Sequence, residues 1–395
     1  MKKTMKQWLA LVSAGMMAFS MSSCSDIMGK VTGLFGSNSV EEEKTAPIIL
    51  PNVTTAKNVI LMIGDGMGPQ QVKAGELFKG EPLAMQGFPY MTLAETRSQS
   101  DSITDSAAAA TALATGVRTK NGVVGMDKNY QELETIVDIA SKLGKRTGVI
   151  ATEKLSGATP MGFSAHATNR NLELELFRSA ATSSNVNFFA SSSITPAHEK
   201  IFVDAGYEHL NDADLISEAT SDKVFGSYLI PATTESMFVN GPHIAFDRLV
   251  KEALEYLSKD EDGFFLMAEG SHIDHGGHNN DICYMLEELI AFDYGVQAVL
   301  EWAKDRNDTV VIVTADHETG GFMLDGAATH EQMVATYEAG GQGDCYQWTS
   351  TGHTSTDVNC YINGADINFK EYSFGTNGRI MNTDIFEIMK KLMGA

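Results

Sequence analysis

Three apolar segments that each run into an acidic turn constrain the fold of this chain more than any other feature. The segments are residues 58–63, 264–268 and 309–314. Their continuous, β-branched character is typical of parallel strands buried on both faces. They lead to Asp65, Glu269 and Asp316. Because the carboxyl ends of parallel strands meet at one edge of a sheet, where α/β proteins bind ligands, we expect these carboxylates to gather there.

The remaining sequence favours a single large α/β domain. Strand-like and helix-like segments alternate from about Asn58 to the end of the 395-residue chain, without an internal repeat. A hydrophobic content of 43% with 36 glycines and 9 prolines is that of a globular protein with a large core. We expect a doubly wound, mostly parallel central sheet flanked by helices over residues 48–395, with the site at the C-terminal edge of the strands.

The N-terminus predicts export and a lipid anchor. Three lysines in the first six residues precede the apolar stretch 8–19, which is too short to span a bilayer and suits a signal-peptide core. The following Ser-Ser-Cys24 resembles a bacterial lipobox, in which the cysteine is lipidated. Ordinary cleavage nearby is the alternative. We expect a lipoprotein-type signal peptide at 1–23, a flexible tether at 24–47, and a location in the periplasm or at the cell surface.

The remaining cysteines would then lie in an oxidising compartment. They are Cys283, Cys345 and Cys360, so one of them stays unpaired. Cys345 and Cys360 flank one loop and could pair, although the spacing does not fix the connectivity. The absence of a Cys-x-x-Cys pattern argues against a cysteine-ligated zinc.

The acidic charge excludes two classes of partner. A formal net charge of -22 opposes nucleic acid and an anionic membrane surface, since binding either requires a basic footprint. Contact with a membrane is therefore expected only through a lipid anchor. The charge also opposes anionic substrates at long range, but bound divalent cations would reverse its sign locally.

The densest cluster of chemical groups follows the second strand. Glu269 is followed by Asp274, His275 and His278. The spacing of four places Asp274 and His278 on one helical face, within reach of a single metal ion. The third strand leads to Asp316-His317, and His353 in a later loop would complete a second metal set. Chance clustering is the alternative, and it does not explain why acids follow three separate strands.

A serine and an arginine complete the candidate site. Ser106 begins an alanine-rich helix that stops at Gly116, and a helix N-terminus favours an anion such as phosphate. An ordinary N-cap role for Asp105 or Ser106 is the alternative. Thr159 supplies a hydroxyl, and the planar fork of Arg170 suits two phosphate oxygens, unless Arg170 is only a surface side chain.

Together these motifs resemble those of the alkaline phosphatase family. They occur in the family's order and cover essentially the whole of residues 48–395. The motifs are Gly64-Asp65-Gly66-Met67-Gly68, Asp105-Ser106-Ala107, Ala158-Thr159-Pro160 with Arg170, Glu269 with Asp274 and His278, Thr314-Ala315-Asp316-His317-Glu318, and Gly352-His353-Thr354.

The resemblance implies two zinc ions and a third ion, usually magnesium. The first zinc would be held by Asp274, His278 and His353. The second would be held by Asp65, Asp316 and His317, with Ser106 as its reacting ligand. The third ion would share Asp65 and add Thr159 and Glu269.

The implied reaction is hydrolysis of phosphate monoesters to an alcohol and inorganic phosphate, through a phosphoserine on Ser106. Arg170 would hold phosphate oxygens, and His275 would take part in substrate binding, as in the mammalian version of the motif. Gly157 stands where relatives commonly carry Asp or His, which predicts a weaker or altered third site. The short chain predicts trimmed accessory insertions such as the crown domain, and the resemblance allows a homodimer.

Two other functions fit parts of the pattern. A phosphodiesterase or sulfatase of the same superfamily shares the metal scaffold, although Ser106 with Arg170 favours monoesters. A tethered lipoprotein that only binds metal or phosphate would show binding without turnover. Comparing rates on aryl phosphate, diester and sulfate separates these alternatives.

Overall fold

The computed structural model describes residues 46–192, 194–228, 245–372 and 378–395. The predicted signal peptide, the lipidation site Cys24 and nearly all of the tether lie outside these residues. Among the helices that are described, none has the length and apolar character needed to cross a bilayer.

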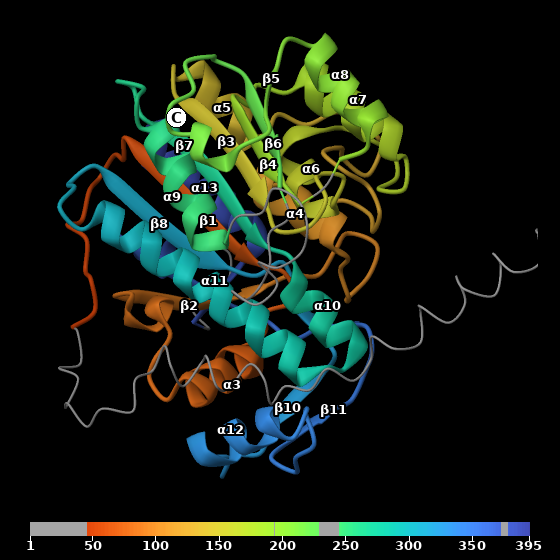
Figure 1. The fold of residues 1–395 in the computed structure, drawn as a ribbon, viewed down its shortest axis with the longest axis vertical. Coiled ribbons are helices and arrows are strands. Elements are labelled where there is room, and N and C mark those ends of the chain that lie inside the picture. Colours follow the sequence, from red (N-terminus) through yellow and green to blue (C-terminus); the bar gives the residue numbers. More distant parts are fainter. Residues whose placement is uncertain (1–45, 193, 229–244, 373–377) are drawn as a thin grey trace, which may run out of the picture.

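A ten-stranded sheet forms the centre of the molecule (Figure 1). From edge to edge it contains β14 (Arg379–Met381), β2 (Tyr90–Glu95), β13 (Val358–Asn363), β8 (Thr309–Thr314), β1 (Asn58–Gly64), β7 (Phe264–Gly270), β3 (Arg146–Ala151), β4 (Phe188–Ser191), β6 (Val224–Ser227) and β5 (Glu208–Leu210). Every neighbouring pair from β8 to β5 is parallel. The exception is β13, which runs antiparallel to β8 and β2. The predicted mostly parallel sheet is confirmed.

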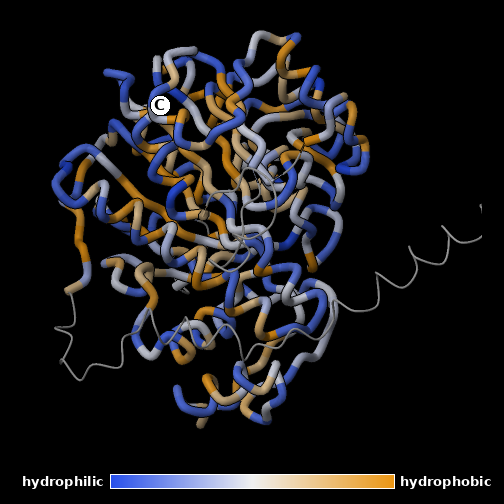
Figure 2. Tube along the Cα trace, viewed as in Figure 1, coloured by the Kyte–Doolittle hydropathy of each residue, from blue (hydrophilic) through white to orange (hydrophobic). Residues whose placement is uncertain are grey.

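The three acid-terminated strands lie side by side in the middle of this sheet. Ile63 of β1 pairs with Glu269 of β7 on one side and with Thr314 of β8 on the other. Asp65 lies two residues after Ile63, and Asp316 lies two residues after its partner Thr314. The two acidic turns therefore begin at the same height along the sheet. All three strands are buried along their whole length. Figure 2 shows apolar residues concentrated along the central strands and hydrophilic residues on the outer loops.

Helices cover both faces of the sheet, as a doubly wound fold requires. Helices α9 (Phe246–Leu257) and α11 (Ile282–Ala303) pack together and cross in front of the sheet in Figure 1. The group on the other face comprises α4 (Ser106–Thr115), α5 (Ile136–Lys142), α6 (Ala158–Ser164) and α13 (Asn382–Met393). The other helices are α3 (Pro69–Lys79), α7 (Glu173–Ser183), α8 (Pro196–Asp204), α10 (His272–Asn279) and α12 (His330–Glu338).

Short elements complete the described chain. Two small antiparallel sheets pair β9 (Glu318–Thr319) with β12 (His353–Thr354) and β10 (Phe322–Leu324) with β11 (Tyr346–Trp348). Single 3-10 turns lie at Ala84–Gly87, Ala213–Leu215 and Phe369–Glu371. The pairing of β9 with β12 matters most for the site, because it brings His353 beside the turn that follows β8.

Helix α4 owes its position to its small side chains. Alanine has the highest helix propensity, and every residue of α4 is buried. The Asp105 carboxylate accepts a hydrogen bond from the Ala108 amide and so caps the helix at its start. Gly116 ends it with a φ of 72°, a left-handed conformation that favours glycine. The Asp105 cap makes Ser106 the first residue of the helix, and Gly116 sets its end.

The cysteine pairing left open above is not formed. Cys360 is buried within β13, in the interior of the sheet. Cys345 is buried elsewhere, with its sulfur 3.4 Å from the hydroxyl of Thr336 in α12. The two side chains belong to separate parts of the core, and no disulfide joins them.

Candidate active site

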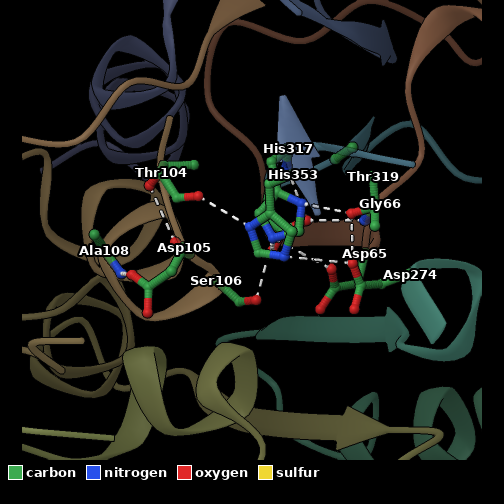
Figure 3. Close-up of polar contacts among 12 residues, drawn as sticks. Asp65, Gly66, Thr104, Asp105, Ser106, Ala108, Asp274, His317, Thr319 and His353 are labelled. Atoms are coloured by element: carbon green, nitrogen blue, oxygen red, sulfur yellow. Dashed lines mark hydrogen bonds and ion pairs between the residues drawn. The ribbon is translucent and has the colours of Figure 1, made fainter. Parts of the chain in front are cut away.

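Ser106 points from the start of α4 into a cluster of imidazole and carboxylate groups. Its Oγ lies 3.2 Å from Nε2 of His317, which follows β8. Figure 3 shows Ser106 on one side of the stacked rings of His317 and His353, and the carboxylates of Asp65 and Asp274 on the other. The cap of α4 is Asp105, so the side chain of Ser106 is not used as an N-cap.

A first group of candidate metal ligands consists of Asp65, Asp316 and His317. Their ligand atoms lie within 4.8 Å of one another, and all three side chains are buried. Nε2 of His317 is 3.0 Å from Asp316 Oδ2 and 3.6 Å from Asp65 Oδ1. The turns after the neighbouring strands β1 and β8 therefore bring these three side chains together, as expected for strands that end at the same edge of a sheet.

The second predicted group, Asp274, His278 and His353, also converges. Asp274 Oδ2 lies 3.3 Å from His278 Nε2, and Asp274 Oδ1 lies 3.6 Å from His353 Nε2. The two Nε2 atoms are 3.2 Å apart. His317 is also within ligand reach of Asp274 and His353, so the two groups adjoin.

Backbone carbonyls orient both imidazoles of the second group. Nδ1 of His278 lies 2.6 Å from the Thr351 carbonyl oxygen, and Nδ1 of His353 lies 2.9 Å from the Thr104 carbonyl oxygen. A proton on each Nδ1 satisfies these contacts and turns each Nε2 toward the centre of the group, where it can bind a metal once it carries no proton. Asp274 is held in turn by the Thr319 hydroxyl, which donates to its Oδ1.

A third set of oxygen atoms lies beside the first group. The Thr159 hydroxyl and both carboxylate oxygens of Glu269 are buried without a hydrogen-bond partner. Asp65 Oδ1 is also buried without a hydrogen-bond partner. Buried oxygens without partners are costly, and a bound cation would satisfy them. The residues present therefore fit metal ions at each position that the sequence predicts.

The protonation equilibria reflect the crowding of these carboxylates. Burial, and then the negative charge of Asp316, raises the pKa of Asp65 well above its usual value. Burial, and then the charge of Glu153, does the same for the pKa of Glu269. Burial would also raise the pKa of Asp274, but a hydrogen bond from His278 and the nearby His317 hold it below its usual value. Such a cluster favours binding of a positive charge.

Arg170 lies at the edge of the site. Its Nη1 donates to Asp105 Oδ2 over 3.2 Å, and its side chain is 35% exposed. Asp105 thus caps the helix that carries Ser106 and also holds Arg170 next to it. This double role of Asp105 was not predicted, although its position directly before Ser106 was a signal.

His275 is placed on α10, one residue after Asp274. Burial, and then the charge of neighbouring His272, lowers its pKa, so His275 is neutral near pH 7. The ring centroids of His275 and His272 are 4.8 Å apart. His275 therefore lies next to the candidate metal ligands, on the helix that carries Asp274 and His278.

The fold and the site define a doubly wound α/β protein with candidate metal ligands at the edge of its central sheet. A sequence profile of the family described as alkaline phosphatase matches residues 56–229 and 240–343. Alkaline phosphatase 3 of Bacillus subtilis is 30% identical over 358 residues, which is 82% of this chain and 71% of that protein. Alkaline phosphatase 4 of the same organism is 29% identical over 321 residues, covering 74% of this chain and 68% of that protein.

Solved structures that resemble this chain are also alkaline phosphatases. The alkaline phosphatase of the Antarctic bacterium TAB5 has 30% sequence identity and a TM-score of 0.74, covering 87% of this chain and 99% of that one. A histidine-to-aspartate variant of that enzyme, described with Mg bound in its M3 site, has 29% identity, a TM-score of 0.72 and the same coverage. The chain belongs to the alkaline phosphatase family, and it is an enzyme. His353 lies beyond the residues matched by the profile, so its place in the site rests on the structure.

Proposed function

We propose that this enzyme hydrolyses phosphate monoesters to an alcohol and inorganic phosphate through a phosphoserine on Ser106. The observation that carries the proposal is the 3.2 Å approach of Ser106 Oγ to His317. It supports a nucleophilic role, because Ser106 begins helix α4 and His317 is within ligand reach of both groups.

The ligand chemistry supports zinc in two positions and magnesium in a third. Mixed carboxylate and imidazole groups suit zinc, and these are Asp274, His278 and His353, and Asp65, Asp316 and His317. An all-oxygen set of Asp65, Thr159 and Glu269 suits magnesium. Bound cations would lower the pKa of the serine hydroxyl and neutralise charge on the oxygens that enter and leave phosphorus.

The chain's own residues carry the transfer. Ser106 Oγ loses its proton and bonds to phosphorus while the ester bond breaks, and the alcohol departs with a proton. Arg170 and the backbone N–H groups at the start of α4 hold the other phosphate oxygens. Asp105 keeps Arg170 in place. Water then attacks phosphorus, the Ser106–phosphorus bond breaks, a proton from the water returns to Ser106 Oγ, and inorganic phosphate leaves.

Replacing the nucleophile tests the proposal. We expect Ser106→Ala to lower kcat on an aryl phosphate by at least about 10³-fold, because no other group would form the covalent intermediate. Its zinc content should match that of the wild type, since Ser106 belongs to neither three-residue ligand group. Ser102→Ala, at an exposed serine in the preceding loop, is the matched control and should keep full activity.

The outcome separates the proposal from its alternatives. Near-wild-type turnover by Ser106→Ala would rule out the serine mechanism. Faster turnover of a diester or a sulfate ester than of a monoester by the wild type would assign it to a different reaction of the superfamily. Phosphate binding without turnover of any of these esters would indicate a binding protein.

We also propose export and lipid anchoring at Cys24. The support is the short apolar stretch before Ser-Ser-Cys24 and the small, polar tether that follows it. The same proposal places the catalytic domain in the periplasm or at the cell surface. A homodimer is the oligomer that the family resemblance allows, and mass measurement in solution would test it.

A further inference from the structure

A carboxylate that the motifs do not include lies next to the third set of oxygens. Glu153 follows β3 by two residues, and Ala151 of β3 pairs with Glu269 of β7. The two adjoining turns are joined, because the Thr152 amide donates to the Glu269 carbonyl over 3.1 Å. The Glu153 amide also donates to the Ser271 hydroxyl over 3.3 Å. The strand order thus places Glu153 and Glu269 at the same edge.

The Glu153 side chain occupies the space in front of Gly157. A Cβ added at Gly157 would overlap the Glu153 oxygen Oε1 and would lie 2.6 Å from its carboxylate carbon. The φ of Gly157 is -52°, which any residue can adopt, so the backbone does not require glycine there. Gly157 immediately precedes α6, the helix that carries Thr159. The carboxylate of Glu153 therefore stands where a side chain at position 157 would be.

The surroundings of Glu153 contain charges of both signs. It is near enough to Glu269 and Asp65 for its negative charge to act on both. The positive groups that act on it are His272, Arg170 and Lys154. The buried oxygens of Thr159 and Glu269 have no hydrogen-bond partner. These unpartnered buried atoms indicate a ligand, and their chemistry indicates a hard divalent cation.

We propose that Glu153 supplies a further carboxylate to the third cation site, in the space that Gly157 leaves open. This inference rests on the proposed magnesium site at Asp65, Thr159 and Glu269. It replaces the expectation that Gly157 weakens that site, because the carboxylate of Glu153 takes the place of the side chain that Gly157 lacks. Gly157 and Glu153 then act as a pair, with the glycine making room for the carboxylate.

Magnesium binding to the zinc-loaded protein tests the inference directly. Calorimetric titration with Mg²⁺ should give a Kd about 10- to 100-fold higher for Glu153→Gln than for the wild type, the range found when a residue supporting a metal site is replaced. Zinc content should stay unchanged. Glu173→Gln is the matched control, because Glu173 contacts Ser156 and Lys154 of the same loop and its side chain is 44% exposed. Its Kd for magnesium should equal that of the wild type.

A swap of positions provides a second readout. Glu153→Ala opens the space in front of Gly157, and Gly157→Asp in that background returns a carboxylate to it. We expect the double variant to bind Mg²⁺ more tightly than Glu153→Ala alone. Equal magnesium affinity in the wild type and Glu153→Gln, or no recovery in the double variant, would overturn the role of Glu153. A wild type that binds no magnesium beyond its zinc would overturn the third site itself.

Discussion

At the scale of single residues, His317 connects the parts of the site. Its ligand atoms are within reach of Asp65 and Asp316 on one side and of Asp274 and His353 on the other. Its Nε2 also contacts Ser106. Its ring stacks on that of His353 with centroids 3.5 Å apart. His317 therefore links Ser106 to both groups of candidate metal ligands.

His278 makes zinc binding depend on pH. A hydrogen bond to the Asp274 carboxylate raises the pKa of His278 to about 9 in the metal-free protein. Zinc needs the neutral imidazole, so below pH 9 the metal must displace a proton. Because the pKa of the buried ligand His317 is also raised, we expect the apparent zinc affinity to rise by at least about tenfold per pH unit between pH 7 and pH 9. Competition with a chelator of known protonation behaviour measures this slope.

A histidine outside the site serves as the control for this prediction. His198 stacks on Phe177, away from the ligand groups, so His198→Asn should keep the wild-type slope. His278→Asn should weaken zinc binding and flatten the pH dependence, because the group that releases the proton is gone. A wild-type zinc affinity that does not change from pH 7 to pH 9 would contradict the assignment of His278.

Sequence reasoning identified the ligand residues better than the residues that support them. Asp65, Asp316 and His317 follow apolar strands in the sequence, so one known property of parallel sheets brings them together. Glu153 also follows a buried strand by two residues, but none of the family motifs includes it. Its importance depends on β3 lying beside β7, and that order of strands cannot be read from either segment alone.

At the scale of elements, the contact between α4 and α6 sets the distance between two parts of the site. Helix α4 begins with Ser106, and α6 carries Thr159. The helices approach closely because Gly162 of α6 faces Ala110 of α4. A Cβ at Gly162 would lie 2.6 Å from the Ala110 Cβ and 3.1 Å from the Ala110 carbonyl carbon. The small side chains in both helices therefore contribute to the geometry of the site.

This contact predicts the effect of a single methyl group. Gly162→Ala gains about 0.5–1 kcal/mol of helix propensity. It also forces a methyl group against rigid backbone, at a cost of about 1–3 kcal/mol. We expect the clash to prevail and Tm to fall by about 2–4 °C in a thermal melt. Gly326→Ala is the control, since no atom lies within 4 Å of its added Cβ. A variant at position 162 at least as stable as the wild type would refute this view of the packing.

The buried strands were the easiest elements to predict and the reversed strand the hardest. The predicted segment 309–314 matches β8, because a short, unbroken apolar run of β-branched residues is typical of a buried strand. The direction of β13 and the pairing of β12 with β9 depend on contacts between segments far apart in the sequence. Local patterns carry no signal for such pairing.

At the scale of the whole molecule, membrane attachment should depend on one lipidated residue. A net charge of -22 repels anionic lipid headgroups, so the polypeptide alone should not stay at a bilayer. We expect Cys24→Ser to move most of the phosphatase activity from the membrane fraction to the soluble fraction, with kcat unchanged. Fractionation followed by an activity assay measures this. Ser37→Ala in the tether should remain with the membrane, and a Cys24→Ser protein that also remains there would exclude the anchor.

The alignment of Ile63 with Glu269 and Thr314 limits how this chain can change in length during evolution. Successive side chains of a strand point to opposite faces, so inserting or deleting one residue in β1 would turn Asp65 away from its partners. Such a change would have to occur together in three neighbouring strands to be tolerated. Gains and losses of residues should therefore accumulate at the outer strands β5 and β14 and in surface loops, while the spacing within the three central strands stays fixed.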